Sequence, residues 1–195
     1  MEKLKIILAT NNPGKLREVR ALLNADFTIL SLSDVSLETE IPEDFETLEE
    51  NALQKALFIH GKTGMNVLAD DTGLEVSALN GEPGVFSARY AGEPSDSEKN
   101  IDKLLLELEG VSNRKAQFRT VMALIVNHEQ FVFEGICEGE ISEHRKGQGG
   151  FGYDPVFVPK GYIESFSQMK LKEKNAISHR GRALQKVSEY LKPHS

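Results

Sequence analysis

The sequence predicts a mixed α/β fold built on a mixed β-sheet. The first thirty residues have the pattern strand, helix, strand, which is typical of a βαβ unit with parallel strands. Further along, two extended runs flank a polar turn at 127–129, which predicts an antiparallel hairpin. A chain of 195 residues can bury a substantial core. We expect one domain, residues 1–195, with two lobes on one sheet.

The first elements alternate between strand and helix. Residues 5–10 and 27–32 are short apolar runs with β-branched residues, so they predict buried strands. Between them, Asn12 can cap a helix and Pro13 suits its first position. Leucine and valine residues then recur at helical spacing, which gives this helix an apolar face.

A second helix and a broken strand are expected next. Thr47 and Glu50 form a capping-box pair at the start of the helix. Its apolar face is predicted to contain Leu48, Ala52, Ala56 and Leu57. A strand at 66–69 follows; we expect the run Asp-Asp-Thr-Gly to interrupt it and an extended segment at 74–79 to resume it.

The second half of the chain is richer in hairpins and loops. Ser95 and Glu98 make a further capping box, before a helix that Gly110 ends. The hairpin strands are predicted at 118–126 and 131–136, and a glycine-rich loop follows at 146–162. Ser178 can cap the last helix.

Composition excludes several classes of protein. A formal net charge of −7 disfavours nucleic-acid and membrane-surface binding, which rely on basic fields, but it permits a small anionic ligand in a cleft. A single cysteine, Cys137, rules out an intrachain disulfide and fits a reducing compartment. The first apolar run is too short for a signal peptide. We therefore expect a cytoplasmic protein.

The segment TNNPGK, residues 10–15, places a lysine in the first turn of a helix. The helix dipole disfavours a cation there, and a strand-to-helix loop offers backbone N–H groups to an anion. A bound phosphate would account for Lys15. The alternative is a solvated lysine on a well-capped helix. The segment does not match a Walker A loop, because Leu16 occupies the serine or threonine position.

Two adjacent aspartates, Asp70 and Asp71, end an apolar run. In a strand their side chains point to opposite faces, so at most one would face a given cleft. Carboxylates at this place suit Mg²⁺ or the activation of a water, and an Asp-rich turn is the alternative. The acidic segment 38–50 could add a second carboxylate or form a solvated face.

Two later motifs suggest a nucleotide. In GGFGYDP, residues 149–155, glycines allow close approach, aromatics can stack on a base and an aspartate can accept a hydrogen bond; a glycine-rich hairpin loop is the alternative. In KNAISHRGRAL, residues 174–184, His179 and Arg180 again place cations in a first helical turn. Arginine suits phosphate or carbonyl oxygens.

Five motifs occur together and in a characteristic order: TNNPGK, ENALQKA, LADDTGLEVSALNGEPGVFSARYAG, GGFGYDP and ISHRGRAL. In this set the chain resembles the inosine triphosphate pyrophosphatase family, the XTP/dITP diphosphatases of bacterial type, over nearly its whole length. The resemblance implies a long curved mixed sheet flanked by helices, two lobes around a central cleft, and a homodimer. It implies Mg²⁺-dependent hydrolysis of ITP, dITP and XTP to the monophosphate and pyrophosphate, which cleanses the nucleotide pool.

The same resemblance implies roles for single residues. Asp71 corresponds to the general base and metal ligand, and Thr72 contacts the substrate. The second metal ligand is Glu40, with Glu43 as the alternative, because the stretch EIPEDFET departs from the family pattern. The other substrate-binding residues are Thr10, Asn11, Asn12, Pro13, Gly14 and Lys15 at the triphosphate, Phe151, Gly152, Tyr153 and Asp154 beside the base, Lys174 at the phosphates, and His179 and Arg180 at the 6-oxo purine face.

Two other classes of function stay open at this point. One is a Mg²⁺-dependent nucleotide phosphohydrolase of broader specificity, which would keep Asp71 and Lys15 but rank substrates differently. The other is a nucleotide-binding regulator without catalysis, which would bind ITP and release no pyrophosphate.

Overall fold

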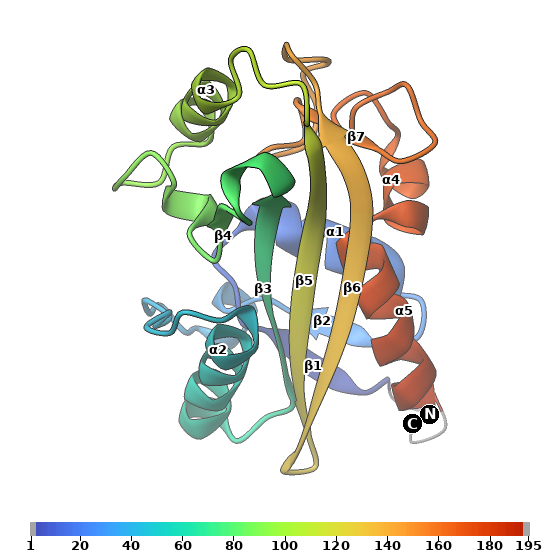
Figure 1. Ribbon diagram of the computed structural model, residues 1–195. Helices are drawn as coiled ribbons and strands as arrows, with labels where there is room; N and C mark the ends of the chain where they lie inside the picture. The colour runs from blue at the N-terminus through green and yellow to red at the C-terminus, as the bar shows by residue number, and fades with distance from the viewer. Residues whose placement is uncertain (1–2, 193–195) are drawn as a thin grey trace. The chain divides into compact units, whose positions relative to one another are not determined.

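The protein has the predicted α/β architecture, with a mixed sheet and helices (Figure 1). A computed structural model describes residues 3–192. The strand order is β2-β1-β3-β5-β6-β7, and β4 pairs with β3. The strands are β1 (Lys5–Leu8), β2 (Thr28–Leu30), β3 (Val67–Val76), β4 (Pro83–Gly84), β5 (Lys115–Val126), β6 (Glu129–Ile141) and β7 (Phe157–Pro159). The helices are α1 (Pro13–Leu23), α2 (Leu48–Thr63), α3 (Ser97–Glu107), α4 (Leu171–Ile177) and α5 (His179–Leu191).

Strand directions confirm that the sheet is mixed. Strand β1 pairs in parallel with β2 and with β3, which is the predicted βαβ arrangement. Strands β3 and β4, and likewise β6 and β7, pair antiparallel. The N-terminal part thus carries the parallel strands, whose connections need helices, and the hairpin-rich part carries the antiparallel ones.

The chain forms two compact units, and the prediction of one domain with two lobes stays a prediction. Unit 1 comprises the described parts of 1–71, 120–135 and 180–195, and unit 2 comprises 72–119 and 136–179. Strands β3, β5 and β6 each contribute residues to both units. The predicted central cleft stays a prediction.

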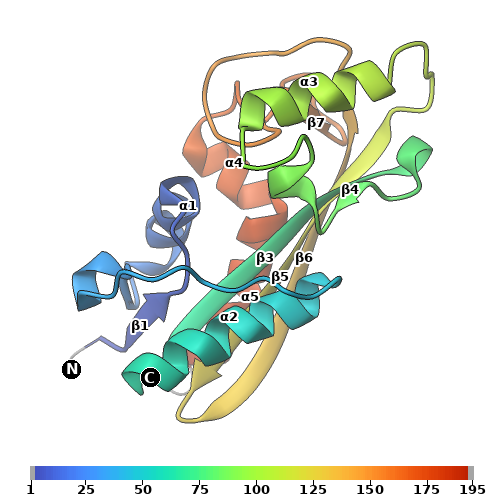
Figure 2. The same cartoon turned by 90° about the vertical axis from the view of Figure 1, so that its left-hand side faces the viewer.

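Unit 1 packs helices on both faces of its strands (Figures 1 and 2). On one face, strand residues such as Leu68 and Met122 form a core with Val19 of α1 and Leu184 of α5. The other face is covered by α2, whose Ala52, Ala56 and Ile59 are fully buried. Small side chains on this face of α2 let the helix approach the strands closely.

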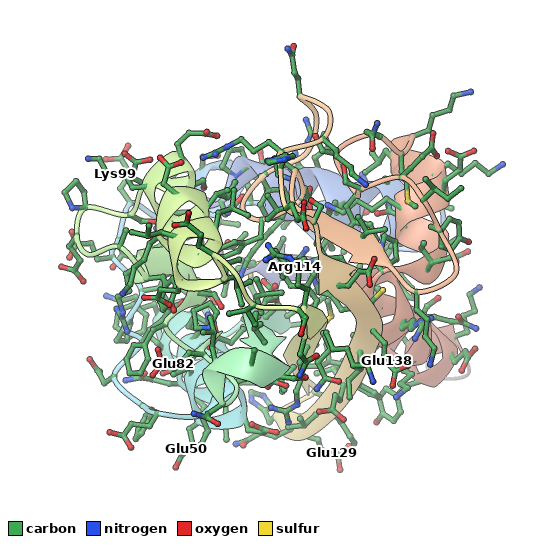
Figure 3. All side chains as sticks on the ribbon, turned by 45° about the horizontal axis from the view of Figure 1, so that its top comes forward. Glu50, Glu82, Lys99, Arg114, Glu129 and Glu138 are labelled. Carbon is green, nitrogen blue, oxygen red and sulfur yellow. The ribbon has the colours of Figure 1, made fainter. Side chains whose placement is uncertain are left out.

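Unit 2 has its own apolar core. Leucine and isoleucine residues of α3 pack there with Phe118, Phe157 and Phe166, whose rings contact one another. Arg114, labelled in Figure 3, donates hydrogen bonds to the carbonyl oxygens of Leu108 and Ile141 at 2.8 and 2.6 Å. This side chain therefore fixes the end of α3 to the end of β6.

Two of the three predicted caps that the structure reports on are confirmed. The Asn12 side chain accepts from the backbone N–H groups of Gly14 and Lys15, and Thr47 Oγ1 accepts from the N–H of Glu50. The prediction of a cap at Ser95 was wrong. Asp96 caps α3, because its carboxylate accepts from the free N–H groups of Glu98 and Lys99 in the first turn.

Two further predictions about elements need correction, and one helix was missed. Strand β3 runs without interruption through Asp70 and Asp71. On α2, Leu57 is 42% exposed, and its predicted place on the buried face is taken by the polar residues Asn51 and Lys55. Helix α4 was not expected, and it ends just before Ser178, so that α5 starts at His179 as predicted.

The predicted hairpin is confirmed and is longer than expected. Strands β5 and β6 meet at Asn127 and His128, which have φ values of 51° and 66°. Left-handed backbone at two successive residues is typical of the tight turns that join antiparallel strands. In the described chain, 3–192, the helices are too short or too polar to traverse a lipid bilayer.

Candidate active site

The lysine at the start of α1 has a buried partner. Lys15 Nζ lies 3.1 Å from Asp70 Oδ2, and only 16% of the lysine side chain is exposed. Burial lowers the pKa of Lys15, and the Asp70 charge acts in the opposite direction. A cation at a helix N-terminus is unfavourable by itself, and the neighbouring carboxylate offsets it.

The loop before α1 is tied by its own side chains. Asn12 Oδ1 accepts from the N–H groups of Gly14 and Lys15 at 2.8 and 3.2 Å, so these two donors already have a partner. The side chain of Asn11 donates to the carbonyl of Thr39. A cavity of about 340 Å³ in unit 1 borders this loop, and its lining includes Thr10, Asn11, Asn12 and Pro13.

Asp70 is buried among cations. Arg180 Nη2 and Nε donate to Asp70 Oδ2 at 3.0 and 3.3 Å, and Arg180 Nη1 donates to Glu18 Oε2 at 2.6 Å. Burial alone would raise the pKa of Asp70, but Lys15 and Arg180 outweigh it, and the pKa lies below its usual value. Arg180, 2% exposed, therefore fixes Asp70 within unit 1, and its role in base recognition stays a prediction.

Asp71 points to the opposite face of β3, toward α2. Lys55 Nζ lies 2.9 Å from Asp71 Oδ1 and 2.5 Å from Glu43 Oε1. Asn51 Nδ2 donates to Asp71 Oδ2 at 3.4 Å. Burial raises the pKa of Asp71 in spite of the lysine, so this carboxylate is a stronger proton acceptor than an exposed aspartate.

Two carboxylates beside Lys55 have the chemistry of a magnesium site. Mg²⁺ takes oxygen ligands, commonly one or two carboxylates together with water and phosphate oxygens. Glu43 and Asp71 both contact the same ammonium group, whereas the backbone carbonyl of Glu40 accepts a hydrogen bond from Thr39 Oγ1. No cluster of three or more His, Cys, Asp or Glu side chains occurs within residues 3–192, so protein ligands alone would not enclose a metal.

Sequence reasoning about the site missed Asn51 and Lys55. Both are buried, at 1% and 3% exposure, and both contact Asp71. The available signal was their helical spacing, since they share one face of α2 with Ala52, Ala56 and Ile59. A lysine among the small side chains on the apolar face of an amphipathic helix needs a buried partner. This requirement marks the lysine as a candidate site residue.

The glycine-rich loop of unit 2 contains a second buried ion pair. Asp154 Oδ2 lies 2.6 Å from Lys174 Nζ and accepts from the N–H of Phe151 at 2.9 Å. Lys174 also lies over the Phe151 ring, 4.9 Å from its centre. Phe151 and Gly152 stay half-buried, whereas Tyr153 and Asp154 are buried. The half-buried ring is thus held at the edge of a rigid, charged cluster.

The other predicted residues of unit 2 are held by packing. Tyr153 donates its hydroxyl hydrogen to the carbonyl of Ser87 at 2.9 Å. The ring of His179 stacks on Phe118, with centres 4.5 Å apart. Thr72 follows Asp71 in β3 and is half-buried. Asn175, next to Lys174, was not predicted; it is 6% exposed, and its Oδ1 accepts no hydrogen bond from the described residues.

Comparison with known proteins gives one consistent result. The sequence model of the Ham1 family matches residues 6–190. The dITP/XTP pyrophosphatase of Christiangramia forsetii is 48% identical over 188 residues, 96% of this chain and 99% of that protein. The dITP/XTP pyrophosphatase of Porphyromonas gingivalis is 50% identical over 188 residues, 96% of this chain and 97% of that protein.

Solved structures agree in fold. The Ham1 protein of Staphylococcus aureus has a TM-score of 0.86 and 38% identity, and the match covers 98% of this chain and 100% of that one. A HAM1 protein from Coxiella burnetii has a TM-score of 0.87 and 40% identity, with 97% of this chain and 99% of that chain covered.

Proposed function

The chain belongs to the Ham1 family, and we propose that it hydrolyses deaminated purine nucleoside triphosphates, ITP, dITP and XTP, to the monophosphate and pyrophosphate. Relatives named dITP/XTP pyrophosphatases support this activity. The observation that carries the proposal is the arrangement around Asp70 and Asp71, where Lys15 and Lys55 stand beside buried carboxylates. Cations suit a polyphosphate, and carboxylates suit a metal and a water.

We propose that Asp71 is the general base. Its raised pKa favours acceptance of a proton from an attacking water, and Lys55 and Asn51 hold its two oxygens in place. Deprotonation of the water lets its oxygen attack the α-phosphorus. The bond from that phosphorus to the bridging oxygen then breaks, and pyrophosphate leaves.

We propose Mg²⁺ as the cofactor, held by Asp71 and by Glu43 or Glu40. The contacts of Lys55 favour Glu43, because they bring its carboxylate to the same ammonium group as Asp71. When bound, Mg²⁺ would neutralise charge on phosphate oxygens and make a water more acidic. Lys55 would then exchange part of its ion pairing for contact with phosphate.

We assign the neutralisation of negative charge on the leaving group to Lys15 and the loop before it. We propose that Thr10, Asn11, Asn12, Pro13 and Gly14 line the phosphates and that Lys15 neutralises them. The partial burial of Lys15 supports this role, because an ion pair gains strength where water is excluded.

Recognition of the purine is assigned to unit 2 and to the start of α5. We propose that Phe151, Gly152, Tyr153 and Asp154 form the wall beside the base. Lys174 would serve the phosphates, Thr72 would contact the substrate, and His179 and Arg180 would read the 6-oxo group. The partly exposed Phe151 ring supports a stacking role.

We also propose that residues 1–195 act as one pyrophosphatase domain, that the protein is a homodimer, and that it works in the cytoplasm. These proposals follow from the family resemblance, and the single cysteine is compatible with a reducing compartment.

A pyrophosphate-release assay over ITP, dITP, XTP, GTP, ATP and pyrimidine triphosphates, with and without Mg²⁺, tests the function. We expect much faster release from the first three than from the other nucleotides, and release only with the metal. A preference for pyrimidine nucleotides would identify a broader phosphohydrolase instead. ITP binding without pyrophosphate release would identify a regulator.

A further inference from the structure

Two histidines face each other at one end of unit 1. His60 lies in the last turn of α2, and His128 lies in the turn between β5 and β6. His60 Nε2 is 3.3 Å from His128 Nδ1, and the two rings are close to perpendicular. Figures 1 and 2 show this turn beside the C-terminal end of α2, and Glu129, which follows His128, is labelled in Figure 3. The turn is also attached by Asn127, whose N–H donates to Asn66 Oδ1 at 3.2 Å.

The hydrogen bonds fix which nitrogen of His60 carries the hydrogen. His60 Nδ1 lies 2.7 Å from the carbonyl oxygen of Met65, which can only accept, so Nδ1 is the donor. In the neutral ring, Nε2 then presents its lone pair toward His128. A carbonyl that orients the far nitrogen of an imidazole is the usual support of a metal-binding histidine.

We propose that His60 and His128 form a Zn²⁺ site that cross-links the end of α2 to the β5–β6 turn. Two imidazole nitrogens on a tetrahedral zinc ion, each bonded at about 2.0–2.1 Å, are roughly 3.3 Å apart. The nitrogens here are already at this separation. The exposed ring of His128 can turn so that both lone pairs meet at one point.

The proton balance of this step is simple. His128 donates through Nδ1 while it contacts His60, and it must bind a metal through that same nitrogen. Its ring hydrogen therefore moves to Nε2, which faces solvent. With both rings neutral, no proton is released when the metal binds.

The site differs in chemistry from the carboxylates around Lys55. Imidazole suits Zn²⁺, Ni²⁺ and Cu²⁺, whereas Mg²⁺ prefers oxygen. Since no third histidine, cysteine or carboxylate joins this pair in the described part of the chain, water would complete the coordination. We expect a reversible site that stabilises the hairpin when zinc is present.

Calorimetric titration of the metal-free full chain with Zn²⁺ at pH 7.5, in excess Mg²⁺, tests this proposal, together with thermal melting. The test variant is His128→Asn, because asparagine tolerates the left-handed backbone at this position. The matched control is His144→Asn, another exposed histidine. We expect one zinc per wild-type or control chain and a raised Tm. In His128→Asn, affinity should fall about tenfold or more, and the Tm shift should vanish.

Two further measurements distinguish zinc bound at the histidine pair from zinc bound at other side chains. In NMR spectra, zinc should move the imidazole signals of His60 and His128 and leave that of His144 in place. The variant Asp71→Asn should keep the His128-dependent binding, which distinguishes this site from the carboxylates. Equal zinc affinity and an equal Tm shift in wild type and His128→Asn would overturn the proposal.

Discussion

Adjacent residues Asp70 and Asp71 have opposite environments, and their contacts explain why. Asp70 faces Lys15 and Arg180 and is 1% exposed. The two cations outweigh the effect of burial, so the pKa of Asp70 is lowered and it stays ionised. Asp71 faces α2, is 7% exposed and has a raised pKa, because burial outweighs the effect of Lys55. One carboxylate therefore suits a structural ion pair, and the other suits proton transfer.

Replacement of the proposed base should abolish turnover while the fold persists. In Asp71→Asn the amide can keep the contact with Asn51, but it accepts no proton from water. We expect kcat for ITP to fall by about 10²–10⁴-fold. Pyrophosphate release gives the rate, and circular dichroism gives the Tm. Near-normal turnover would remove Asp71 from this role.

Substitution of the neighbouring Asp70 should instead lower the stability of the fold. Asp70→Asn leaves Lys15 and Arg180 buried with one carboxylate fewer, and removal of one member of a buried ion pair costs about 3–5 kcal/mol. The free energy of unfolding, measured by urea denaturation, should fall by that amount. Asp71→Asn serves as the control, because Lys55 keeps its ion pair with Glu43 in that variant. Equal stability of the two variants would contradict this division of roles.

Lys15 should matter more for binding than for stability. In Lys15→Met, Asp70 keeps both hydrogen bonds from Arg180, and the cost of burying the ammonium group disappears. We expect the free energy of unfolding to change by no more than about 1 kcal/mol. Inorganic tripolyphosphate should raise the Tm of the wild type and leave that of the variant unchanged. Loss of several kcal/mol with unaltered KM for ITP would refute this account.

At the level of elements, local sequence signals predicted where helices start and where turns lie better than they predicted the continuity of strands. Asn12 and Thr47 cap helices because the side chain needs only a nearby N–H group. By contrast, β3 passes through Asp70 and Asp71, where the sequence predicted a break. Cations from α1, α2 and α5 compensate the two charges, and nothing within the strand itself indicates them.

The glycine-rich loop of unit 2 depends on one glycine in particular. A side chain at Gly150 would overlap the carboxylate of Asp154, and its φ of 78° is unfavourable for other residues. Gly150→Ala should therefore displace the Asp154–Lys174 pair, lower the Tm and raise KM. The matched control is Gly161→Ala, with a similar φ of 87° and open space around it. Backbone strain alone costs about 1–2 kcal/mol, so equal effects in both variants would show that the contact with Asp154 does not matter.

At the scale of the whole molecule, the order of the elements could be predicted because hydrophobic period and turn residues are local. The pairing of Lys55 with Asp71 could not be predicted. Sixteen residues separate the two, and the position of α2 along β3 decides whether they meet. The same holds for Arg180 and Asp70, which are 110 residues apart. Motifs thus located the chemistry along the chain, and the fold decides which charges neutralise one another.

The assignment of chemistry to unit 1 and of base recognition to unit 2 predicts two kinetic phenotypes. Asp71→Asn should lower kcat for ITP, XTP, GTP and ATP by the same factor, because the base acts on a water and not on the purine. Phe151→Ala should lower kcat/KM for ITP and XTP more than for ATP. Stacking on Phe151 places the 6-oxo group of a purine against hydrogen-bond donors of the protein. An adenine leaves these donors unpaired, at a cost of about 1–3 kcal/mol for each buried group. Steady-state kinetics on the four nucleotides measure both ratios. If Phe151→Ala left the ranking of substrates intact while Asp71→Asn altered it, the assignment would have to be exchanged between the two units.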